Sequence, residues 1–373
     1  MRRAPGIVRD SIIGYLSAAE SASLAEIQEA LSLRIGGVPT SSVRSYLNLN
    51  TPHLFERTAR GHYRLKNGCD QSPNEAAEQS FKIDRATLLQ AECFEWLRSC
   101  EPRSVQAVVT DPPYGLVEYT DGEQAKLREA RGGGIWRVPP SYDGHKRSPL
   151  PRFTVLNDGE RAALQDFFFE FGKLVLRVTV PGANVIVASN PLLVHLVANA
   201  MSQAGLELRG NIVRLVMTMR GGDRPKNAHN EFPNVSVMPR SMFEPWVILR
   251  HPLEGRVQDN LRRWKTGGFQ RISDTKPFGD VIKSSPTSPR ERKIAPHPSL
   301  KPQLFLRHLV RSVLPLGEGV VLDPFAGSGS TLAAANAIGY ASIGIEKDAS
   351  FVKMARKAIP QLAALSIQHV DPI

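Results

Sequence analysis

The chain has 373 residues, of which 42% are hydrophobic, and 47 Lys and Arg against 36 Asp and Glu give it a net charge of +11. This length predicts one large domain and one small one, and the basic charge favours an anionic partner, with nucleic acid first and an acidic membrane surface second. The three cysteines contain no CxxC pair, which excludes a disulfide framework and a zinc finger and is typical of a cytoplasmic protein. No stretch reaches 18 unbroken apolar residues, so we expect no membrane span.

The first 66 residues predict a small domain of their own. The segment GIVRDSIIGYLSAA has helical spacing, Ser23 and Glu26 form a capping-box pattern before a second helix, and PTSSVRSYLNL predicts a third. The segment LFERTARGHYRLK alternates about Gly61 as a hairpin does. Three helices and a basic hairpin resemble a winged helix-turn-helix, for which a protein-docking wing is the alternative to DNA binding. The expected phosphate contacts include Arg44, Arg60 and Arg64.

Residues 67–80 are polar and predict a linker. From residue 81 to residue 373, β-branched apolar runs alternate with helical patterns, which predicts an α/β domain built on a mostly parallel sheet. Two stretches interrupt the alternation, 116–153 and 250–296, and both are rich in Gly, Pro and Arg. Loops of this length in a compact domain are usually functional or disordered, so we expect the first to lie at an active site.

The segment TDPPYG follows the apolar run VQAVV. Two prolines cannot donate to a sheet, so the strand must end there and present Asp111 and Tyr114 at its tip. At the carboxyl end of a strand in an open α/β sheet, side chains point into the ligand crevice. A carboxylate, a carbonyl fixed by Pro113 and an aromatic face together suit a planar base with an exocyclic amine, which must leave the duplex to reach them.

The segment GVVLDPFAGSGSTLAAANAIGYASIGIEKD predicts a strand, a glycine turn, a helix and a second strand that ends at Glu346. Gly327 and Gly329 let the backbone approach a ligand, and Glu346 is placed to hold the hydroxyls of a ribose. The turn lacks the Lys of a P-loop, and Leu332 replaces the third glycine of a dinucleotide fingerprint. Since Asp323 would repel a pyrophosphate but attract an ammonium, S-adenosylmethionine is the favoured cofactor.

The motifs TDPPYG at 110–115, HPSLKP at 297–302 and DPFAGSGST at 323–331 resemble those of the amino-group DNA methyltransferases, and their order matches the beta group of that family. The resemblance covers about 81–360. It implies a Rossmann-like, seven-stranded, mostly parallel sheet with one antiparallel edge hairpin. It also implies transfer of a methyl group from S-adenosylmethionine to adenine N6 in double-stranded DNA, by base flipping and direct displacement, and members of the family often form a homodimer. A cognate restriction endonuclease as partner and a solitary methyltransferase are both open.

The resemblance carries over residue by residue. It assigns the target base to Asp111, Pro112, Pro113 and Tyr114. It assigns the cofactor to Glu92, Cys93, Asp323, Phe325, Gly327, Ser328, Gly329, Glu346, Pro298, Ser299 and Lys301. Family members commonly have Gly-Asp where this chain has Ala91-Glu92, although the longer acid would still reach an adenine amine. A Lys near a helix N-terminus is a natural carboxylate anchor, which is the role expected of Lys301.

The resemblance to the beta group implies that residues 250–296 are the target-recognition segment. Eleven Lys and Arg against five Asp and Glu give 250–293 a net charge of +6, more than half of the total, which favours a surface that faces DNA. The expected DNA contacts there are Arg262, Arg263, Lys265 and Arg271.

Several other functions remain open or are excluded. The same acceptors would serve the N4 amine of cytosine, although such enzymes more often carry Ser where this chain has Asp111. A catalytically inactive DNA-binding regulator is a further alternative. Methylation of cytosine C5 needs a thiolate that usually follows a proline, and no cysteine does so here. Nine scattered His without paired-ligand spacing predict no metal site.

Overall fold

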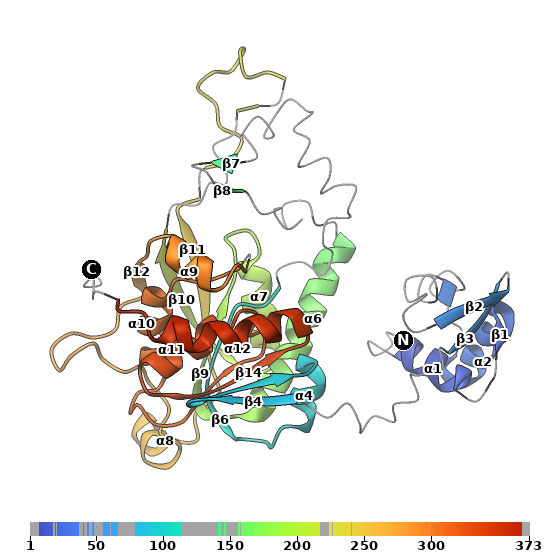
Figure 1. Cartoon of the computed structure of the whole chain (residues 1–373), viewed down its shortest axis with the longest axis horizontal. Coiled ribbons are helices and arrows are strands. Elements are labelled where there is room, and N and C mark those ends of the chain that lie inside the picture. The colour runs from blue at the N-terminus through green and yellow to red at the C-terminus, as the bar shows by residue number, and fades with distance from the viewer. Residues whose placement is uncertain are drawn as a thin grey trace. The chain divides into compact units, whose positions relative to one another are not determined.

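The computed structural model divides the chain into two compact units, residues 1–77 and 78–373, each described here by itself (Figure 1). The structure describes residues 7–17, 19, 21–36, 40, 43–44, 47, 55–59, 61–65, 79–113, 141–142, 145–146, 156, 158–216, 224–225, 227–239, 241–297 and 299–367. In these ranges, no helix combines the length and the apolar character that crossing a bilayer requires.

The described part of the first unit contains α1, α2 and a small antiparallel sheet, and residues 40, 43, 44 and 47, within the segment predicted as a third helix, are also helical. In chain order its elements are α1 (Ile7–Leu16), β1 (Ala22–Ser23), α2 (Leu24–Ile35), β2 (Phe55–Ala59) and β3 (His62–Leu65). The strands pair in the order β1-β3-β2. The predicted capping box is confirmed, because the Glu26 amide donates to Ser23 Oγ (3.3 Å) and the Ser23 amide donates to Glu26 Oε2 (2.7 Å). Ile12, Ile27 and Phe55 are fully buried in a core of this unit's own.

The second unit is built on a nine-stranded sheet with the order β12-β10-β11-β9-β6-β13-β14-β5-β4. Its strands are β4 (Gln79–Ile83), β5 (Ala86–Gln90), β6 (Val105–Thr110), β9 (Thr179–Ala188), β10 (Glu207–Leu215), β11 (Phe243–Arg250), β12 (Val281–Lys283), β13 (Val320–Asp323) and β14 (Ala341–Glu346). From β5 to β9 the neighbours are parallel, and β11 is antiparallel to both β9 and β10. The seven strands from β5 to β10 are the mostly parallel sheet that the resemblance implies.

Two strands extend this sheet beyond the seven. β4 pairs antiparallel with β5, and β12 pairs parallel with β10, so the predicted antiparallel hairpin is covered on its outer side. Because β4 begins at Gln79, the last two residues of the predicted linker are part of the sheet. A separate two-stranded ladder joins β7 (Ser141–Tyr142) to β8 (His145–Lys146), inside the stretch 116–153 that is expected to be an active-site loop. The rest of that stretch lies outside the described residues.

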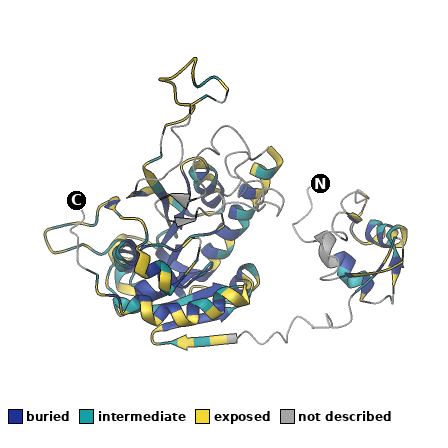
Figure 2. Cartoon of the chain, turned by 45° about the horizontal axis from the view of Figure 1, so that its top comes forward, coloured by how far each residue is buried: buried dark blue, intermediate teal, exposed yellow. Residues whose placement is uncertain are grey.

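Helices cover both faces of the sheet. They are α4 (Cys93–Ser99), α6 (Asp158–Val178), α7 (Val194–Gln203), α8 (Val257–Trp264), α9 (Pro289–Ile294), α10 (Gln303–Val313), α11 (Ser330–Ala337) and α12 (Ala349–Ala363). Alternate residues of β9 enter different cores: Val185 and Val187 pack with α6 and α7, whereas Ile186 and Ala188 pack with α10. Figure 2 shows the resulting layers, with buried strands between helices whose outer surfaces are exposed.

The strand directions define two edges of the sheet. We call the edge where the parallel strands end the carboxyl edge; it holds Gln90, Thr110, Ala188, Asp323 and Glu346. The antiparallel strand β11 begins at this edge, and β10 ends there. The opposite edge, where the parallel strands begin, is the amino edge. In α/β proteins of this kind, ligands bind at the carboxyl edge.

Candidate active site

The tips of β6 and β13 are neighbours at the carboxyl edge. The two strands pair in parallel, with Val321 opposite Ala107 and Leu322 opposite Val108. At their ends, Thr110 Oγ1 donates a buried hydrogen bond of 2.7 Å to Asp323 Oδ1. Asp111 follows Thr110 directly, so the predicted base-binding tip and the predicted cofactor turn leave the sheet side by side.

The glycine turn is held open by backbone geometry and by Glu346. Gly327 and Gly329 have φ angles of 51° and 78°, in the left-handed region that favours glycine. A Cβ at Gly329 would come within 2.5 Å of Ile359 Cγ1, so α11 begins where only glycine fits. The Gly327 amide donates to Glu346 Oε2 (2.9 Å), and the Asp348 amide donates to Glu346 Oε1 (2.8 Å). Glu346, predicted to hold a ribose, therefore also fixes the turn.

Asp323 is buried beneath the turn, with a relative exposure of 3%. Burial raises the pKa of its carboxyl group to about 6, although hydrogen bonds from Thr110 and from the Phe325 amide favour the ionised form. A carboxylate that burial makes costly gains most from a cationic partner. The site therefore suits a ligand that carries an ammonium group close to the turn.

Of the predicted cofactor residues that follow β5, Glu92 is exposed and Cys93 is buried in the core. The Ala91 amide donates to the Glu346 carbonyl (3.1 Å), which brings the end of β5 to the end of β14. Glu92 is exposed and caps α4 by accepting from the Glu95 amide (2.9 Å). Cys93 is buried in the core, and burial raises the pKa of its thiol well above the usual value.

Phe325 precedes the turn, and Ser328 lies within it. The Phe325 ring packs on two rings of α6, with centroid distances of 6.2 Å to Phe167 and 5.4 Å to Phe171. Ser328 is buried, and its Oγ lies 3.0 Å from Ser330 Oγ at the start of α11. Phe325, which was predicted only as a cofactor contact, is thus also partly a core residue.

The HPSLKP segment folds over the glycine turn. A Cβ at Gly327 would lie 3.2 Å from the His297 ring, and that ring also contacts Phe351, with centroids 4.5 Å apart. Burial lowers the pKa of His297, and its Nδ1 accepts a hydrogen bond from the Ser299 amide (3.1 Å). Sequence reasoning missed His297, although it is the first letter of the motif. Pro298 and Tyr114 lie outside the described residues.

Lys301 has partners that the sequence did not suggest. Its Nζ lies 2.8 Å from Asp111 Oδ2 and 2.7 Å from Glu244 Oε1. Glu244 Oε2 in turn lies 2.6 Å from Arg214 Nη1. The expected carboxylate anchor is therefore joined to two carboxylates of the chain itself. Sequence reasoning missed Glu244 and Arg214. The one signal that could have indicated them is that each is a charged residue inside an otherwise apolar strand segment.

The end of β9 contributes two further polar groups to the carboxyl edge. Ser189 and Asn190 directly follow the strand and are buried, and Asn190 Oδ1 accepts hydrogen bonds from the amides of Leu192 and Leu193. Within the described residues, Ser189 Oγ and Asn190 Nδ2 have no hydrogen-bond partner. Buried polar groups are nearly always paired, so these two atoms suit a polar ligand. Neither residue was predicted.

Three residues expected to contact DNA, Arg262, Arg263 and Lys265, lie at the amino edge; we call them the α8 cations. Arg103, just before β6, donates from Nη1 to Glu254 Oε1 (2.8 Å), and Glu254 Oε2 accepts from Trp264 Nε1 (3.2 Å). The Gly267 amide donates to the Gly182 carbonyl near the start of β9 (2.9 Å). Figure 1 shows α8 at the opposite end of the sheet from α9. The α8 cations therefore lie at the other edge of the sheet from Asp111, because β11 is antiparallel and delivers the chain to the amino edge.

The later part of 250–296 returns to the carboxyl edge. β12 pairs with residues 213–215 at the end of β10, and the Ser284 amide donates to the Leu215 carbonyl (3.1 Å). Past this point the chain enters α9, where Glu291 Oε1 accepts from the Gln303 amide (2.7 Å). This part carries three exposed basic residues, which we call the edge cations: Lys283, Arg290 and Lys293.

The remaining predicted DNA contacts are dispersed. Arg271 is exposed in the loop before β12, and its Nε donates to the Ser273 carbonyl (3.3 Å). In the first unit Arg44 is exposed, and Arg64 pairs with Glu56 across the hairpin (2.7 Å). Arg60 lies outside the described residues.

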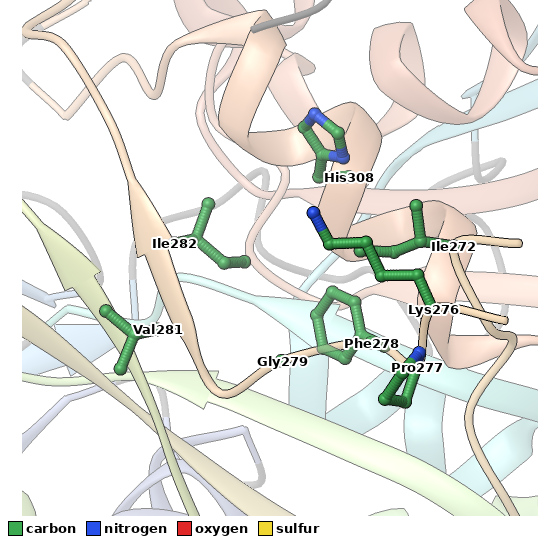
Figure 3. Close-up of a pocket in the computed structure, with 8 residues that line it drawn as sticks. All are labelled: Ile272, Lys276, Pro277, Phe278, Gly279, Val281, Ile282 and His308. Atoms are coloured by element: carbon green, nitrogen blue, oxygen red, sulfur yellow. The ribbon is translucent and has the colours of Figure 1, made fainter. Parts of the chain in front are cut away.

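A small cavity of about 240 Å³ lies between the loop before β12 and α10 (Figure 3). Its walls are mostly apolar, with Phe278 and Ile282 from the loop and strand, His308 from α10, and Lys276 beside them. Of the predicted catalytic and cofactor residues that the structure describes, none lines it. Among the described residues, no three His, Cys, Asp or Glu side chains gather in a way that would hold a metal ion.

The sequence is similar to those of known DNA methyltransferases. The model of the DNA methylase family (N6_N4_Mtase) matches residues 105–357. The type II methyltransferase M2.LlaDCHI of Lactococcus lactis subsp. cremoris is 24% identical over 281 residues, covering 75% of this chain and 91% of the relative. The type II methyltransferase M2.DpnII of Streptococcus pneumoniae is 22% identical over 285 residues, with the same two coverages. Among solved structures, the cytosine-N4-specific PvuII DNA methyltransferase has a TM-score of 0.49 and 13% identity, covering 79% of this chain and 92% of that one.

Proposed function

This chain belongs to the DNA methylase family, and from that premise we propose that it is a site-specific DNA methyltransferase that transfers a methyl group from S-adenosylmethionine to the N6 amine of adenine. The observation that supports this most strongly is the pairing of β6 with β13. Through it, Asp111 leaves the sheet beside Asp323 and the glycine turn, so an amine held at one tip would face a cofactor held at the other.

The residues at the turn fit the cofactor. S-adenosylmethionine, when bound, supplies a methyl group on a sulfonium, an electrophile that an amine nitrogen attacks directly. Gly327 and Gly329 have left-handed backbone and no side chain, so the backbone of the turn can approach a ligand closely, and Asp323 offers a buried carboxylate to an ammonium. Glu346, at the end of β14, is the acid for the ribose hydroxyls.

The residues that follow β6 bind the target base. Asp111 accepts a hydrogen bond from the exocyclic amine, and Pro112 and Pro113 fix the backbone so that a carbonyl accepts the second N–H. Both acceptors draw the amine nitrogen out of conjugation with the ring. Tyr114 stacks on the extruded base, and such stacking is worth about 1–3 kcal/mol against the unstacking cost of a few kcal/mol. Transfer would form the nitrogen–carbon bond, break the carbon–sulfur bond to leave a neutral thioether, and release one proton from the methylated nitrogen to water.

The partners follow from the same chemistry. Double-stranded DNA is the substrate, and the exposed edge cations suit its phosphates at the carboxyl edge. The order α1-β1-α2 and the sheet β1-β3-β2 support a winged-helix role for the first unit in DNA binding. A homodimer, a cognate restriction endonuclease and a cytoplasmic location complete the proposal.

Nucleoside analysis of methylated DNA tests this function. The protein is incubated with unmethylated genomic DNA and isotope-labelled S-adenosylmethionine, and the DNA is digested to nucleosides for mass spectrometry. We expect labelled N6-methyladenine. Labelled N4-methylcytosine would support the alternative base, which the same acceptors would serve, and the absence of label in DNA would reject the methyltransferase activity.

A pair of aspartate variants ties the activity to the strand tip. Asp111→Ala is expected to abolish transfer, because the amine loses its carboxylate acceptor. Asp166→Ala removes an exposed carboxylate on α6 and serves as the matched control, with transfer close to that of the unchanged protein. Full activity in Asp111→Ala would remove Asp111 from the mechanism.

A further inference from the structure

A chain of alternating charges runs inward from the proposed base-binding carboxylate. Asp111 is joined to Lys301, Lys301 to Glu244, and Glu244 to Arg214, with contacts of 2.8, 2.7 and 2.6 Å. The relative exposures of the four side chains lie between 8% and 16%. We call these residues the ion-pair chain. Ion pairs this short and this shielded from water are screened far less than surface pairs.

The fold brings the four residues together from distant parts of the sequence. Arg214 and Glu244 stand directly opposite each other in the antiparallel ladder of β10 and β11. Lys301 precedes α10, and Asp111 follows β6. All four lie at the carboxyl edge, because β6 and β10 end there and β11 begins there.

Aromatic side chains hold the two cations in place. Lys301 Nζ lies 6.0 Å from the centre of the Trp246 ring, and the Arg214 guanidinium lies 5.2 Å from that of Phe305. Trp246 and Phe305 are fully buried and contact each other, with centroids 5.3 Å apart. Lys301 is therefore fixed by packing as well as by charge.

The charges stabilise one another's ionised forms. Burial alone would lower the pKa of Lys301, but the carboxylates of Asp111 and Glu244 raise it above its usual value. Burial alone would raise the pKa of Glu244, but Lys301 and Arg214 lower it. Removing Lys301 would leave two carboxylates near each other with little water to shield them, which is costly.

We propose that Lys301 is a positioning residue that fixes the Asp111 carboxylate for the base amine, and that Glu244 and Arg214 hold Lys301 in that position. This inference rests on the proposed function and replaces the expected role of Lys301 as an anchor for the cofactor carboxylate. To serve as that anchor, the ammonium would have to give up contacts with two carboxylates that are largely shielded from water.

The ion-pair chain also touches the segment expected to recognise the target. Arg214 Nε donates to Ser284 Oγ (3.0 Å), and Arg214 Nη2 donates to the Ser285 carbonyl (3.2 Å). Both serines follow β12, next to the edge cation Lys283. A side chain in the sheet thus connects the recognition segment with the residue that holds the amine.

Steady-state kinetics of Lys301→Gln separates the two roles of the lysine. If Lys301 positions Asp111, kcat falls about 30- to 100-fold, as a misplaced catalytic group does, while KM for S-adenosylmethionine changes less than about threefold. Lys357→Met removes an exposed lysine on α12 and is the matched control, with kcat within about twofold of the unchanged protein. A large rise in KM for the cofactor, with kcat restored at saturation, would overturn the proposal in favour of the anchor.

A second variant keeps the test valid if Lys301→Gln does not fold. Glu244→Gln preserves the contact between Lys301 and Asp111 but removes the charge that fixes Lys301 from behind. We expect kcat to fall about 3- to 10-fold with an unchanged KM for the cofactor. An unchanged kcat in this variant would overturn the supporting role of Glu244.

A thermal-unfolding cycle judges the inference even if the protein methylates nothing. The cycle compares the unchanged protein, Asp111→Asn, Lys301→Gln and the double variant. The proposal predicts that the double variant loses less stability than the two single losses together, because either substitution alone already breaks the pair. Additive losses would overturn it. If the unchanged protein methylates no DNA but the cycle shows coupling, the proposed function is rejected while the interaction between Asp111 and Lys301 is supported.

Discussion

Asp323→Asn is expected to remove the part of the pH dependence of cofactor binding that Asp323 causes. The pKa of Asp323 is raised to about 6 by burial, so the carboxyl is ionised at pH 7 and largely protonated at pH 5. If only the ionised form holds the ammonium of S-adenosylmethionine, the Kd of the unchanged protein rises about tenfold between pH 7 and pH 5. The Asn side chain keeps an oxygen that accepts from Thr110, but it carries no charge to titrate.

The same substitution has an opposite effect on stability. The folded-state pKa of Asp323 lies above the ordinary value of 3.8, so the group contributes stability below about pH 4 and loses that contribution as pH rises through about 6. A shift of this size corresponds to as much as about 3 kcal/mol at pH 7. Asp323→Asn is therefore expected to unfold at a higher temperature than the unchanged protein at pH 7, while it binds the cofactor more weakly.

Isothermal titration calorimetry with S-adenosylmethionine from pH 5 to pH 8, at constant ionic strength, measures the binding effect. His297 lies against the same turn, and its protonation at low pH would also weaken the binding of a cation. The Asn variant retains His297, so its residual slope gives the histidine contribution. A Kd that does not change between pH 7 and pH 5 in the unchanged protein would refute the assigned role of Asp323, as would an equal slope in the variant.

Three further predictions concern the turn, the DNA surface and the hydrogen bond to Asp323. Gly329→Ala is expected to lower the free energy of unfolding in urea by about 2–4 kcal/mol, because the methyl group would collide with Ile359 at a positive φ. Gly268→Ala, where a Cβ would meet nothing within 4 Å among the described residues, should change it by less than about 0.5 kcal/mol. Neutralising the three edge cations should reduce the slope of log K against log salt for duplex DNA by roughly 3, and a larger loss on neutralising the α8 cations would contradict the assignment of the two edges. Thr110→Val is expected to raise the pKa of Asp323 and to move the midpoint of the pH dependence of cofactor binding upward; an unmoved midpoint would show that this bond does not tune the carboxyl.

The features that the sequence predicted are local ones. Asp111 and the glycine turn each follow an apolar strand within a few residues, so their place at the carboxyl edge follows from strand direction alone. Lys301 was expected near the site because it belongs to a motif. Its partners Glu244 and Arg214 could not be predicted, since they meet only through the order and register of β10 and β11.

The position of the α8 cations could not be predicted from the sequence. A count of charges over 250–293 measures how basic the segment is, but it does not say to which edge each part runs. That depends on β11 being antiparallel, which sends the chain to the amino edge before β12 brings it back. The sequence predicted seven strands and missed two of the nine. β12 has only three residues, and β4 begins in a polar stretch, so neither has the apolar run that indicates a strand.

A crystal structure of the protein with S-adenosylmethionine bound tests the central claim most directly. The account predicts that the sulfonium lies between the turn at Gly327–Gly329 and the tip at Asp111, with the amino group of the methionine moiety at Asp323 and the methyl group directed toward the Asp111 side. A cofactor bound in the cavity beside α10, or one whose methyl group points away from Asp111, would contradict it.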